Sequence, residues 1–324
     1  MLVTAVGSYP KIGPPAKAPS LRAAIHRLDA GQIDGQELRR IEDETTKEVI
    51  QQQVEAGLEM VTDGQVHWED GQTYFARGIK GFAIHGLIRY FDTNTYYRQP
   101  VPEGKLEWQG PIAVEDYRLA VASSPRPVKA VITGPCTLAR LSQSGCYGDV
   151  ASLARELAQV LNKEALALQE AGAPLIQFDE PAIVKWKEDM ALLEEVSHTV
   201  TRGLTTRTAI YTWFGDVASV APDLFRLPYQ VFGLDFVWGP ANWGVLNHFP
   251  PEKELGLGIM DGRNTRIEPV EELVECIRRA ARHVSLDRVH LSPSCGLDYL
   301  PRENAVKKLK RLSEAARRAR EVLA

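Results

Sequence analysis

The stretch Leu175-Ile176-Gln177-Phe178-Asp179-Glu180-Pro181 decides the fold. Its apolar run ends in two carboxylates and a proline, which is typical of a buried strand whose carboxyl end opens into a site. Pro181 ends the strand because it has no amide hydrogen for the sheet. Asp179 and Glu180 point in opposite directions on an extended chain, so no more than one of them faces inward. Asp179 would either cap the following helix or act in a functional site, and we favour the functional site.

The unit of helix, glycine, strand and aspartate occurs twice. Glu55-Ala56-Gly57 precedes an apolar run that ends at Asp63, and Glu170-Ala171-Gly172 precedes the run that ends at Asp179. Such self-similarity indicates a repeating architecture. Apolar runs near residues 5, 60, 130, 177, 209, 233, 257 and 290 are predicted strands. They predict an α/β fold of the (β/α)8, or TIM, barrel class, in one domain over residues 1–324.

A doubly wound sheet is the alternative fold, but no Gly-x-Gly-x-x-Gly follows the first strand. Helical periodicity is predicted over residues 20–29, 36–56, 153–168, 190–201, 269–283 and 302–323. Residues 82–117 break the alternation and are rich in aromatic side chains. We interpret them as an inserted hairpin or lid across the mouth of a site, with a hairpin of no functional role as the alternative.

Composition excludes several classes of protein. The 324 residues carry a net charge of -4, which gives no electrostatic reason to expect a nucleic acid or an anionic membrane as a partner. No apolar run is long enough to span a membrane, and the first residues do not resemble a secretory signal. Four cysteines are too few for a disulfide framework, so we expect a reducing cytoplasm. The sequence leaves the oligomeric state open.

Polar side chains gather at the predicted carboxyl ends of the strands, where barrels of this class form their active sites. Converging carboxylates would bind a cationic group, such as an amino-acid ammonium, or share a proton. The predicted catalytic residues are Asp179, Cys295, His67, Asp261 and Arg263. The predicted substrate-binding residues are Ser8, Asp63, Gln65, Asp179, Glu180, Tyr211, Trp213 and Asp235.

Cys295 is the cysteine that follows a predicted strand with a glycine beside it. A thiolate at that position would be a metal ligand or a nucleophile, and we retain Cys295 as a candidate metal ligand. A small buried side chain is the alternative reading of an isolated cysteine.

Several motifs together resemble the cobalamin-independent methionine synthase family. They begin at Val6, Thr133, Gln177, Gly258 and Ser292, and they read VGSYPKIG, TGPCTL, QFDEPA, GIMDGRNT and SPSCGL. They stand in the family's order from the first strand to the last, so the resemblance covers nearly the whole chain. The chain is long enough for one barrel, like the short members of the family, whereas long members contain two.

The resemblance implies methyl transfer to the thiol of homocysteine. The donor would be a reduced folate or, in some short members, a methyl-corrinoid carried by a partner protein. A zinc ion would hold the thiol as a thiolate. By the same resemblance, Ser8, Gln65 and Asp179 would hold the amino-acid substrate, and an ammonium beside Asp179 agrees with the electrostatic argument.

The sequence departs from the family at the zinc site. Catalytic barrels carry His-x-Cys after the strand that here ends at Tyr211, then a glutamate, then a cysteine in Cys-Gly-Leu. Here Trp213-Phe214-Gly215 replaces His-x-Cys, Asp235 stands at the glutamate position, and Cys295 remains. A tetrahedral zinc site needs more ligands than these. Two segments, Tyr211-Thr212-Trp213-Phe214-Gly215 and Asp261-Gly262-Arg263-Asn264, resemble the zinc-free N-terminal barrel of the long enzymes, which helps to hold the glutamate tail of the folate.

Three functions are consistent with this pattern. The first is a methyltransferase of the methionine-synthase type, which we favour. The second is a cofactor-free enzyme of the uroporphyrinogen decarboxylase-like superfamily, in which carboxylates, Arg263 and His67 would transfer protons. The third is a non-catalytic barrel that binds a folate or another methyl carrier.

Overall fold

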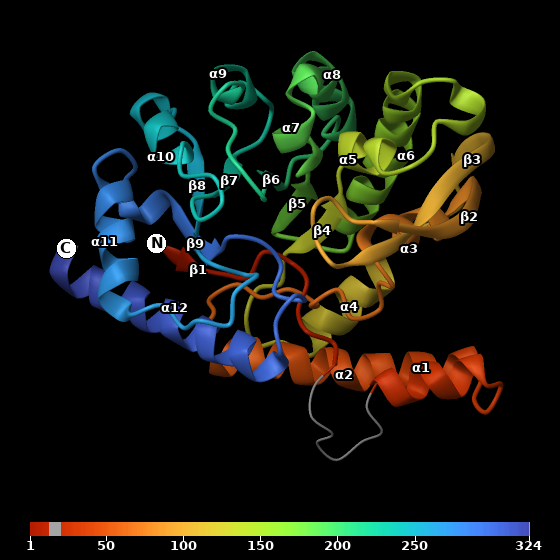
Figure 1. Cartoon of the computed structure of the whole chain (residues 1–324), viewed down its shortest axis with the longest axis horizontal. Coiled ribbons are helices and arrows are strands. Elements are labelled where there is room, and N and C mark those ends of the chain that lie inside the picture. The colour runs from red at the N-terminus through yellow and green to blue at the C-terminus, as the bar shows by residue number, and fades with distance from the viewer. Residues whose placement is uncertain (13–20, 324) are drawn as a thin grey trace.

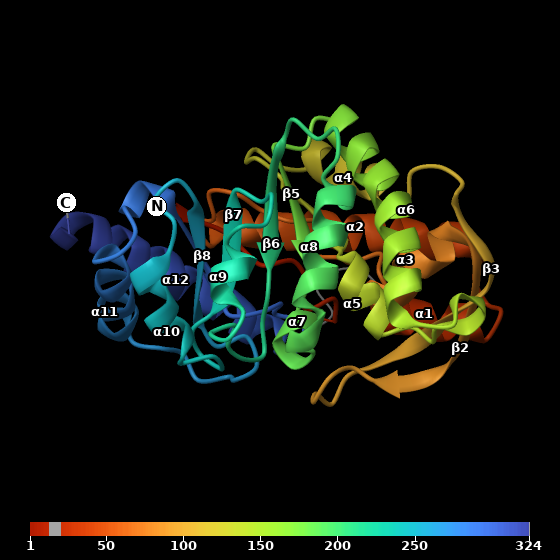
Figure 2. The same ribbon diagram turned by 90° about the horizontal axis from the view of Figure 1, so that it is seen from above.

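The structure, a computed structural model, describes residues 1–12 and 21–323. Seven parallel strands form one curled sheet in the order β1-β9-β8-β7-β6-β5-β4. The strands are Leu2–Val3 (β1), Ala130–Thr133 (β4), Leu175–Asp179 (β5), Arg207–Tyr211 (β6), Val231–Asp235 (β7), Glu254–Met260 (β8) and Val289–Pro293 (β9). Helices surround the curled sheet (Figures 1 and 2). The predicted α/β class is therefore confirmed.

The remaining predicted strand, the one near residue 60, is reduced to two single-residue bridges. Met60 bridges Thr4 beyond β1, and Val61 bridges Val128 ahead of β4, both in the parallel sense. The segment thus lies between the two edges of the sheet. Left-handed glycines at Gly57 and Gly64, with φ of 90° and 70°, stand on either side of the segment.

Six long helices lie where periodicity predicted them. They are Leu21–Asp29 (α1), Gly35–Glu55 (α2), Val150–Glu170 (α6), Met190–Val200 (α8), Val270–Ala281 (α11) and Arg302–Leu323 (α12). A further helix, Val114–Ala122 (α4), was not predicted and begins within the predicted insertion. Shorter helices are Gly71–Gly78 (α3), Pro135–Arg140 (α5), Ala182–Lys185 (α7), Ala221–Leu224 (α9) and Asn242–Val245 (α10). The predicted start of the first helix, at residue 20, and the motif residue 13 lie outside the described residues.

The structure explains why a glycine follows the helix in both copies of the repeated unit. Gly57 ends α2 and Gly172 ends α6, with φ of 90° and 88°. The amide that follows each glycine, of Leu58 or Ala173, bonds to a carbonyl five residues earlier. This left-handed cap turns the chain from the helix into the next strand segment, and glycine adopts it without a Cβ clash.

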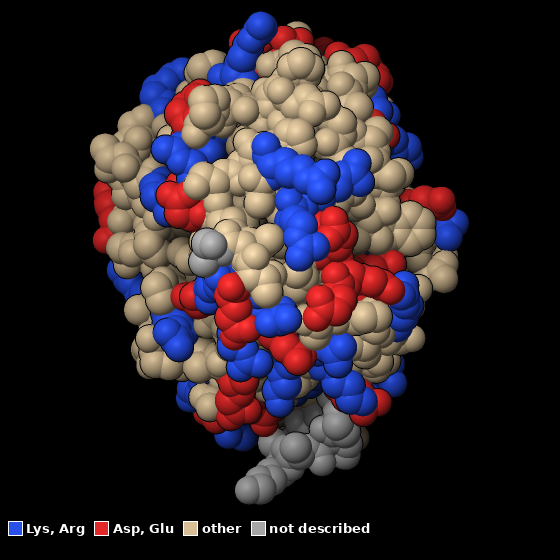
Figure 3. All heavy atoms as spheres, turned by 90° about the vertical axis from the view of Figure 1, so that its left-hand side faces the viewer, with Lys and Arg blue, Asp and Glu red and all other residues tan. Residues whose placement is uncertain are grey.

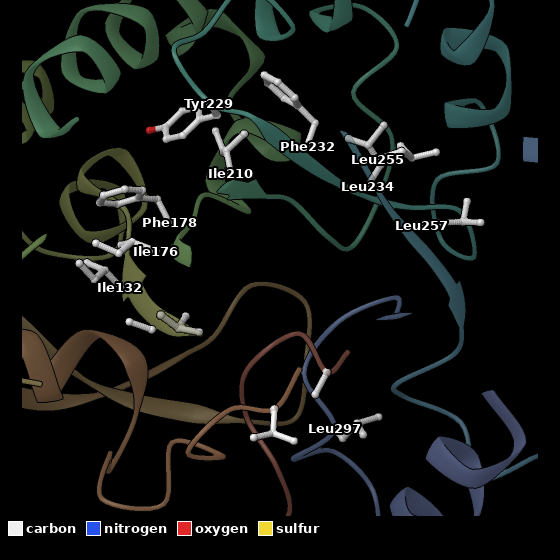
Figure 4. Close-up of a cluster of buried hydrophobic side chains, with 14 of the residues drawn as sticks. Ile132, Ile176, Phe178, Ile210, Tyr229, Phe232, Leu234, Leu255, Leu257 and Leu297 are labelled. Atoms are coloured by element: carbon white, nitrogen blue, oxygen red, sulfur yellow. The ribbon is translucent and has the colours of Figure 1, made fainter. Parts of the chain in front are cut away.

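Side chains on the strands alternate between two apolar regions. Ile176 and Phe178 of β5 pack outward with Ile210 and Phe232 of the next strands, and Figure 4 shows this cluster. Leu175 belongs instead to a smaller cluster inside the sheet's curl, which also contains Tyr211. This alternation places Gln177 and Asp179 on the inner side of β5.

The predicted insertion is an antiparallel hairpin of Ile79–Arg89 (β2) and Tyr96–Trp108 (β3). It starts earlier than predicted, and the end of the predicted insertion belongs to α4. Figure 2 shows the hairpin projecting from the sheet. Glu164 of α6 anchors its base because the carboxylate accepts hydrogen bonds from Trp108 Nε1 and from the amides of Ile112 and Ala113, at 2.8–2.9 Å.

The surface shows paired charges. In Figure 3, acidic side chains lie beside basic ones on the face that carries the C-terminal part of the chain. Arg278 pairs with Glu275 on α11, and Arg318 pairs with Glu321 on α12. Among the described helices, none combines the length and apolar character needed to cross a membrane.

Candidate functional site

A cavity of about 110 Å³ lies at the carboxyl ends of the strands. Four of the predicted site residues line it, namely Ser8, Gln65, Asp179 and Trp213. The wall also contains residues that the site prediction did not include, namely Lys11, Trp68, Glu69, Asp70, Tyr90, Asp298 and Tyr299. Segments far apart in the sequence therefore meet at this cavity, as expected for a barrel of this class.

Asp179 lies at the end of β5 with 8% of its surface exposed. Its Oδ1 accepts a hydrogen bond of 2.6 Å from Gln177 Nε2, and no described protein group donates to its Oδ2. Burial raises the pKa of Asp179 to about 7, although the bond from Gln177 and the nearby Lys129 ammonium oppose the shift. Asp179 therefore offers a free carboxylate oxygen to a cationic group in the cavity.

Glu180 points to the opposite side of the chain. It is fully buried, and its carboxylate accepts hydrogen bonds from the amides of Cys136 and Thr137 and from Thr137 Oγ1, at 2.7–2.9 Å. Those amides form the first turn of α5, so Glu180 binds the positive end of that helix. It does not line the cavity. Gly134 permits the approach, since a Cβ there would lie 2.3 Å from the carboxylate.

Ser8 and Asp298 form the side of the cavity next to β1 and β9. Ser8 Oγ donates a hydrogen bond of 2.6 Å to Asp298 Oδ1. Gln65 reaches the same region over Gly7, where a Cβ would lie 2.6 Å from Gln65 Nε2. A side chain at position 7 would therefore force the end of Gln65 to move from its place at the cavity.

Lys11 provides a positive charge at the cavity wall. Burial lowers the pKa of its ammonium, and the carboxylates of Asp298, Glu42 and Asp70 oppose the shift. None of these groups is within ion-pair distance, and Lys11 makes no hydrogen bond with any described residue. It is the one lysine or arginine among the described residues of the wall.

Aromatic rings close the outer side of the cavity. Tyr90 and Phe91 stand at the hairpin tip, and the Phe91 ring lies 5.9 Å from Phe214 and 6.1 Å from Trp186. Tyr90 lies 6.2 Å from Phe214 and lines the cavity. The tip of the hairpin is therefore docked on the loops that follow β5 and β6.

Arg263 joins the rim to the hairpin tip. Its guanidinium lies 4.9 Å from the ring centre of Phe214 and 4.7 Å from that of Trp238. Its Nη2 donates to the carbonyl of Asp92 at 3.3 Å. The predicted catalytic residue Arg263 thus contacts the rim and is not part of the cavity wall.

We predict that Arg263→Met loosens the hairpin tip. The change removes two cation–π contacts and one hydrogen bond, worth about 1–2 kcal/mol together. Amide hydrogen exchange over residues 90–95 should become about tenfold faster. Arg266→Met is the matched control, because Arg266 pairs with Glu272 on the surface at 2.8 Å. Equal exchange at the tip in both variants would remove this role from Arg263.

His67 lies outside the cavity wall, between α2 and α4. Its Nε2 is 2.8 Å from Asp43 Oδ1. Its buried Nδ1 is 3.6 Å from Asp116 Oδ1 and has no hydrogen-bond partner among the described residues. Burial lowers the pKa of His67, while the Asp116 carboxylate opposes the shift. The structure therefore does not bring His67 to Asp179, and its catalytic role stays a prediction.

Three predicted aspartates organise loops by bonding to nearby amides. Asp63 accepts from the amide of Gln65 at 3.0 Å, and Asp261 accepts from that of Arg263 at 2.8 Å. Asp235 accepts from the amides of Val237, Trp238 and Phe214 at 2.9–3.0 Å. None of the three lines the cavity.

Cys295 does not meet the requirements of a zinc site. Its thiol is fully buried, its Sγ lies 3.3 Å from the Gly296 carbonyl, and burial raises the pKa of the thiol well above its usual range. Across residues 1–12 and 21–323, no group of three or more His, Cys, Asp or Glu side chains has the arrangement of a metal site. The described residues therefore do not fit the zinc that the family resemblance implies.

Three wall residues that the site prediction did not include, Lys11, Tyr90 and Asp298, lie in loops. Lys11 lies within the first matched motif, and Asp298 directly follows the last one, which ends at Leu297. Tyr90 belongs to the aromatic insertion. Position within or next to the motifs could have indicated Lys11 and Asp298, whereas the docking of Tyr90 depends on the path of the hairpin.

Comparison with known proteins places these features in a family. The sequence matches the family model "Cobalamin-independent synthase, Catalytic domain" over residues 1–318. It is 32% identical over 324 residues to a methionine synthase of Saccharolobus solfataricus, covering 99% of this chain and 95% of that protein. A methionine synthase of Sulfurisphaera tokodaii is 31% identical, with 99% and 93% of the two chains covered.

The fold is also similar to that of solved structures. The structure of a B12-independent methionine synthase from a Shewanella species, in complex with selenomethionine, superimposes with a TM-score of 0.84 and 24% sequence identity. The superposition covers 100% of this chain and 99% of that chain. With the matched family model and relatives, the chain belongs to the family of the cobalamin-independent synthase catalytic domain.

Proposed function

We propose that this protein is a methyltransferase that transfers a methyl group to the thiol of homocysteine and releases methionine. The matching relatives are methionine synthases at 31–32% identity over nearly the full chain. We also propose that the curled sheet and the segment at Met60 and Val61 act together as a closed (β/α)8 barrel in a single domain over residues 1–324.

The free oxygen of Asp179 is the observation that carries the proposal. A homocysteine ammonium would pair with it, with Asp298 as a second carboxylate in the same wall. The substrate carboxylate would face Lys11, whose ammonium has no other bonded partner among the described residues. The carboxylates of the wall complement the ammonium of an amino acid, and Lys11 complements its carboxylate.

The methyl donor would approach from the aromatic rim. We propose a reduced folate, or a methyl-corrinoid presented by a partner protein, because flat conjugated ring systems stack well on aromatic side chains. Phe214, Tyr90 and Trp213 supply such surfaces at the mouth. The hairpin would act as a lid that moves away to admit the donor, as its docked tip suggests.

The zinc ion of the family is left out of this proposal, because the described side chains do not fit it. We predict that the purified protein contains far less than one zinc per chain and that Cys295→Ala does not alter the metal content. Elemental analysis of both proteins after dialysis without chelator measures this. One zinc per chain that is lost in Cys295→Ala would contradict the prediction and restore Cys295 as a ligand.

The test of the function is a methyl-transfer assay with homocysteine and either methyltetrahydrofolate or methylcobalamin. Formation of methionine with one donor supports the proposal and identifies the donor. Absence of methionine with both donors, together with no binding of homocysteine or methionine, would overturn it.

The four cysteines are free thiols, which agrees with the reducing cytoplasm expected from the sequence.

A second function is favoured by one observation, the incomplete zinc ligand set. A barrel that binds the amino acid and the methyl carrier without catalysing transfer would keep Asp179 and lose the metal ligands. Tight binding of methionine without turnover, in the presence of either donor, would select this function.

A further inference from the structure

Lys129 is a buried lysine behind the cavity wall. It immediately precedes β4, and 1% of its surface is exposed. Its Nζ donates a hydrogen bond of 2.6 Å to Gln177 Oε1 and lies 4.7 Å from the ring centre of Tyr211. No carboxylate lies within ion-pair distance of this Nζ among the described residues. Burial of an unpaired ammonium is costly, so its presence here requires a reason.

Gln177 connects Lys129 to Asp179. Its Nε2 donates to Asp179 Oδ1 at 2.6 Å and to the Val6 carbonyl at 2.9 Å. With the amide reversed, its nitrogen would face the lysine donor and its oxygen would face two acceptors. The three partners therefore fix the amide orientation, with the oxygen on Lys129 and the nitrogen on Asp179.

We propose that Lys129 is a positioning residue that keeps Asp179 ionised through the Gln177 bridge, so that Asp179 can bind the substrate ammonium. The inference rests on the proposed function for the identity of the ligand. The effect of Lys129 on the ionisation of Asp179 does not depend on which ligand binds. An ammonium that polarises the bridging amide strengthens the hydrogen bond from Nε2 to a carboxylate more than to a neutral carboxyl group.

The surrounding charges agree with this role. Burial lowers the pKa of Lys129 to about 7 and raises that of Asp179 to about 7, while their mutual attraction opposes both shifts. From β9, His290 faces the same interior, and burial lowers its pKa, while the bond to Glu254 opposes the shift. Its Nε2 lies 2.7 Å from Glu254, and Arg207 also pairs with that carboxylate.

The remaining titratable neighbours do not replace Lys129. Tyr211 of β6 has a buried hydroxyl without a partner among the described residues, and burial raises its pKa above the physiological range. Glu180 raises the pKa of Asp179 slightly and is bound to α5. Asp63, on the segment beside β4, accepts from the amide of Gln65. Lys129 is thus the cation that stabilises the Asp179 carboxylate.

Removal of the lysine charge should raise the pH at which Asp179 ionises. In Lys129→Met we expect the midpoint to rise by at least about one pH unit, which reduces the ionised fraction at pH 7 from about one half to about one tenth. Methionine binding should then be about fivefold weaker at pH 7 and should recover most of this loss by about pH 8.5, where more of the carboxylate is ionised and the methionine ammonium is still charged.

The experiment measures methionine affinity against pH by calorimetry in wild type, Lys129→Met and Gln177→Met. Gln177→Met cuts the bridge and retains the lysine, so its midpoint should also rise. Lys308→Met is the matched control, because Lys308 is a fully buried lysine on α12 that bonds to Glu268 at 2.7–2.8 Å. Its midpoint should not move, although the fold is destabilised.

A second readout needs no ligand. NMR follows protein whose aspartate carboxyl groups are labelled with 13C. The Asp179 resonance is the one that is absent in Asp179→Asn. Its titration is compared between wild type and Lys129→Met. An unchanged midpoint in Lys129→Met, with affinity reduced equally at every pH, would show a structural role only and overturn the inference. If wild-type protein binds no amino acid, and the Asp179 midpoint measured by NMR is still higher in Lys129→Met than in wild type, the proposed function is overturned and this inference stands.

Discussion

Asp179→Asn is expected to abolish amino-acid binding while the fold stays intact. Asparagine keeps the shape and can still accept from Gln177 Nε2, so the local packing is preserved. The charge that faces the cavity is lost, and an unpaired ammonium in a desolvated site costs about 2–5 kcal/mol. Affinity for homocysteine or methionine should therefore fall by at least about thirtyfold.

Calorimetric titration of the variant with methionine measures this effect, and thermal unfolding provides the control for the fold. Burial raises the pKa of Asp179, so loss of the ionised carboxylate should not reduce stability at neutral pH. An affinity within about threefold of wild type would mean that Asp179 does not contact the ligand.

Glu180→Gln is expected to have the opposite effect, with lost stability and retained binding. The glutamate carboxylate accepts three hydrogen bonds at the start of α5, from Cys136 and Thr137. A neutral amide has one oxygen, and its NH2 group would face an amide donor. The free energy of unfolding should fall by about 1–3 kcal/mol, as for a buried charge-assisted network.

Denaturant unfolding measures the stability, and methionine titration measures the binding. Glu180 does not line the cavity, so the affinity should change by less than about threefold. A variant with wild-type stability and no binding would show that Glu180 serves the ligand and that its bonds to α5 are incidental. The pair of neighbouring variants therefore separates the two carboxylates of one strand end.

Sequence periodicity predicted seven of the sheet strands and six of the long helices because strong local signals bound them, whereas α3 and α4 were not predicted. Gly57 and Gly172 end their helices with a left-handed turn, which is a local requirement that the sequence states directly. The eighth strand differs because pairing is a tertiary property. The segment at Met60 pairs with each edge of the sheet through one residue only. No pattern within the segment itself reveals that its pairing is so short.

The candidate site was predicted in part. Strand alternation assigned opposite directions to Asp179 and Glu180, and the structure confirms that only Asp179 faces the cavity. Asp235 ends its strand as Asp179 does, so the two look alike in sequence. In the structure, however, the oxygens of Asp235 bond to loop amides. Lys11 and Tyr90 reach the cavity from irregular segments, whose paths depend on tertiary packing.

The central claim, that Asp179 holds the ammonium of an amino-acid ligand, is tested most directly by methionine affinity between about pH 5.5 and about pH 8.5. Methionine keeps both its charges over this range, so a change in affinity reports the protein. Because burial raises the pKa of Asp179 to about 7, the carboxylate is neutral below that pH. We predict that affinity falls about tenfold for each pH unit below the midpoint and is constant above it. The same compound without its amino group should show no such dependence. Methionine affinity that is independent of pH, or equal for the two compounds, would contradict the account.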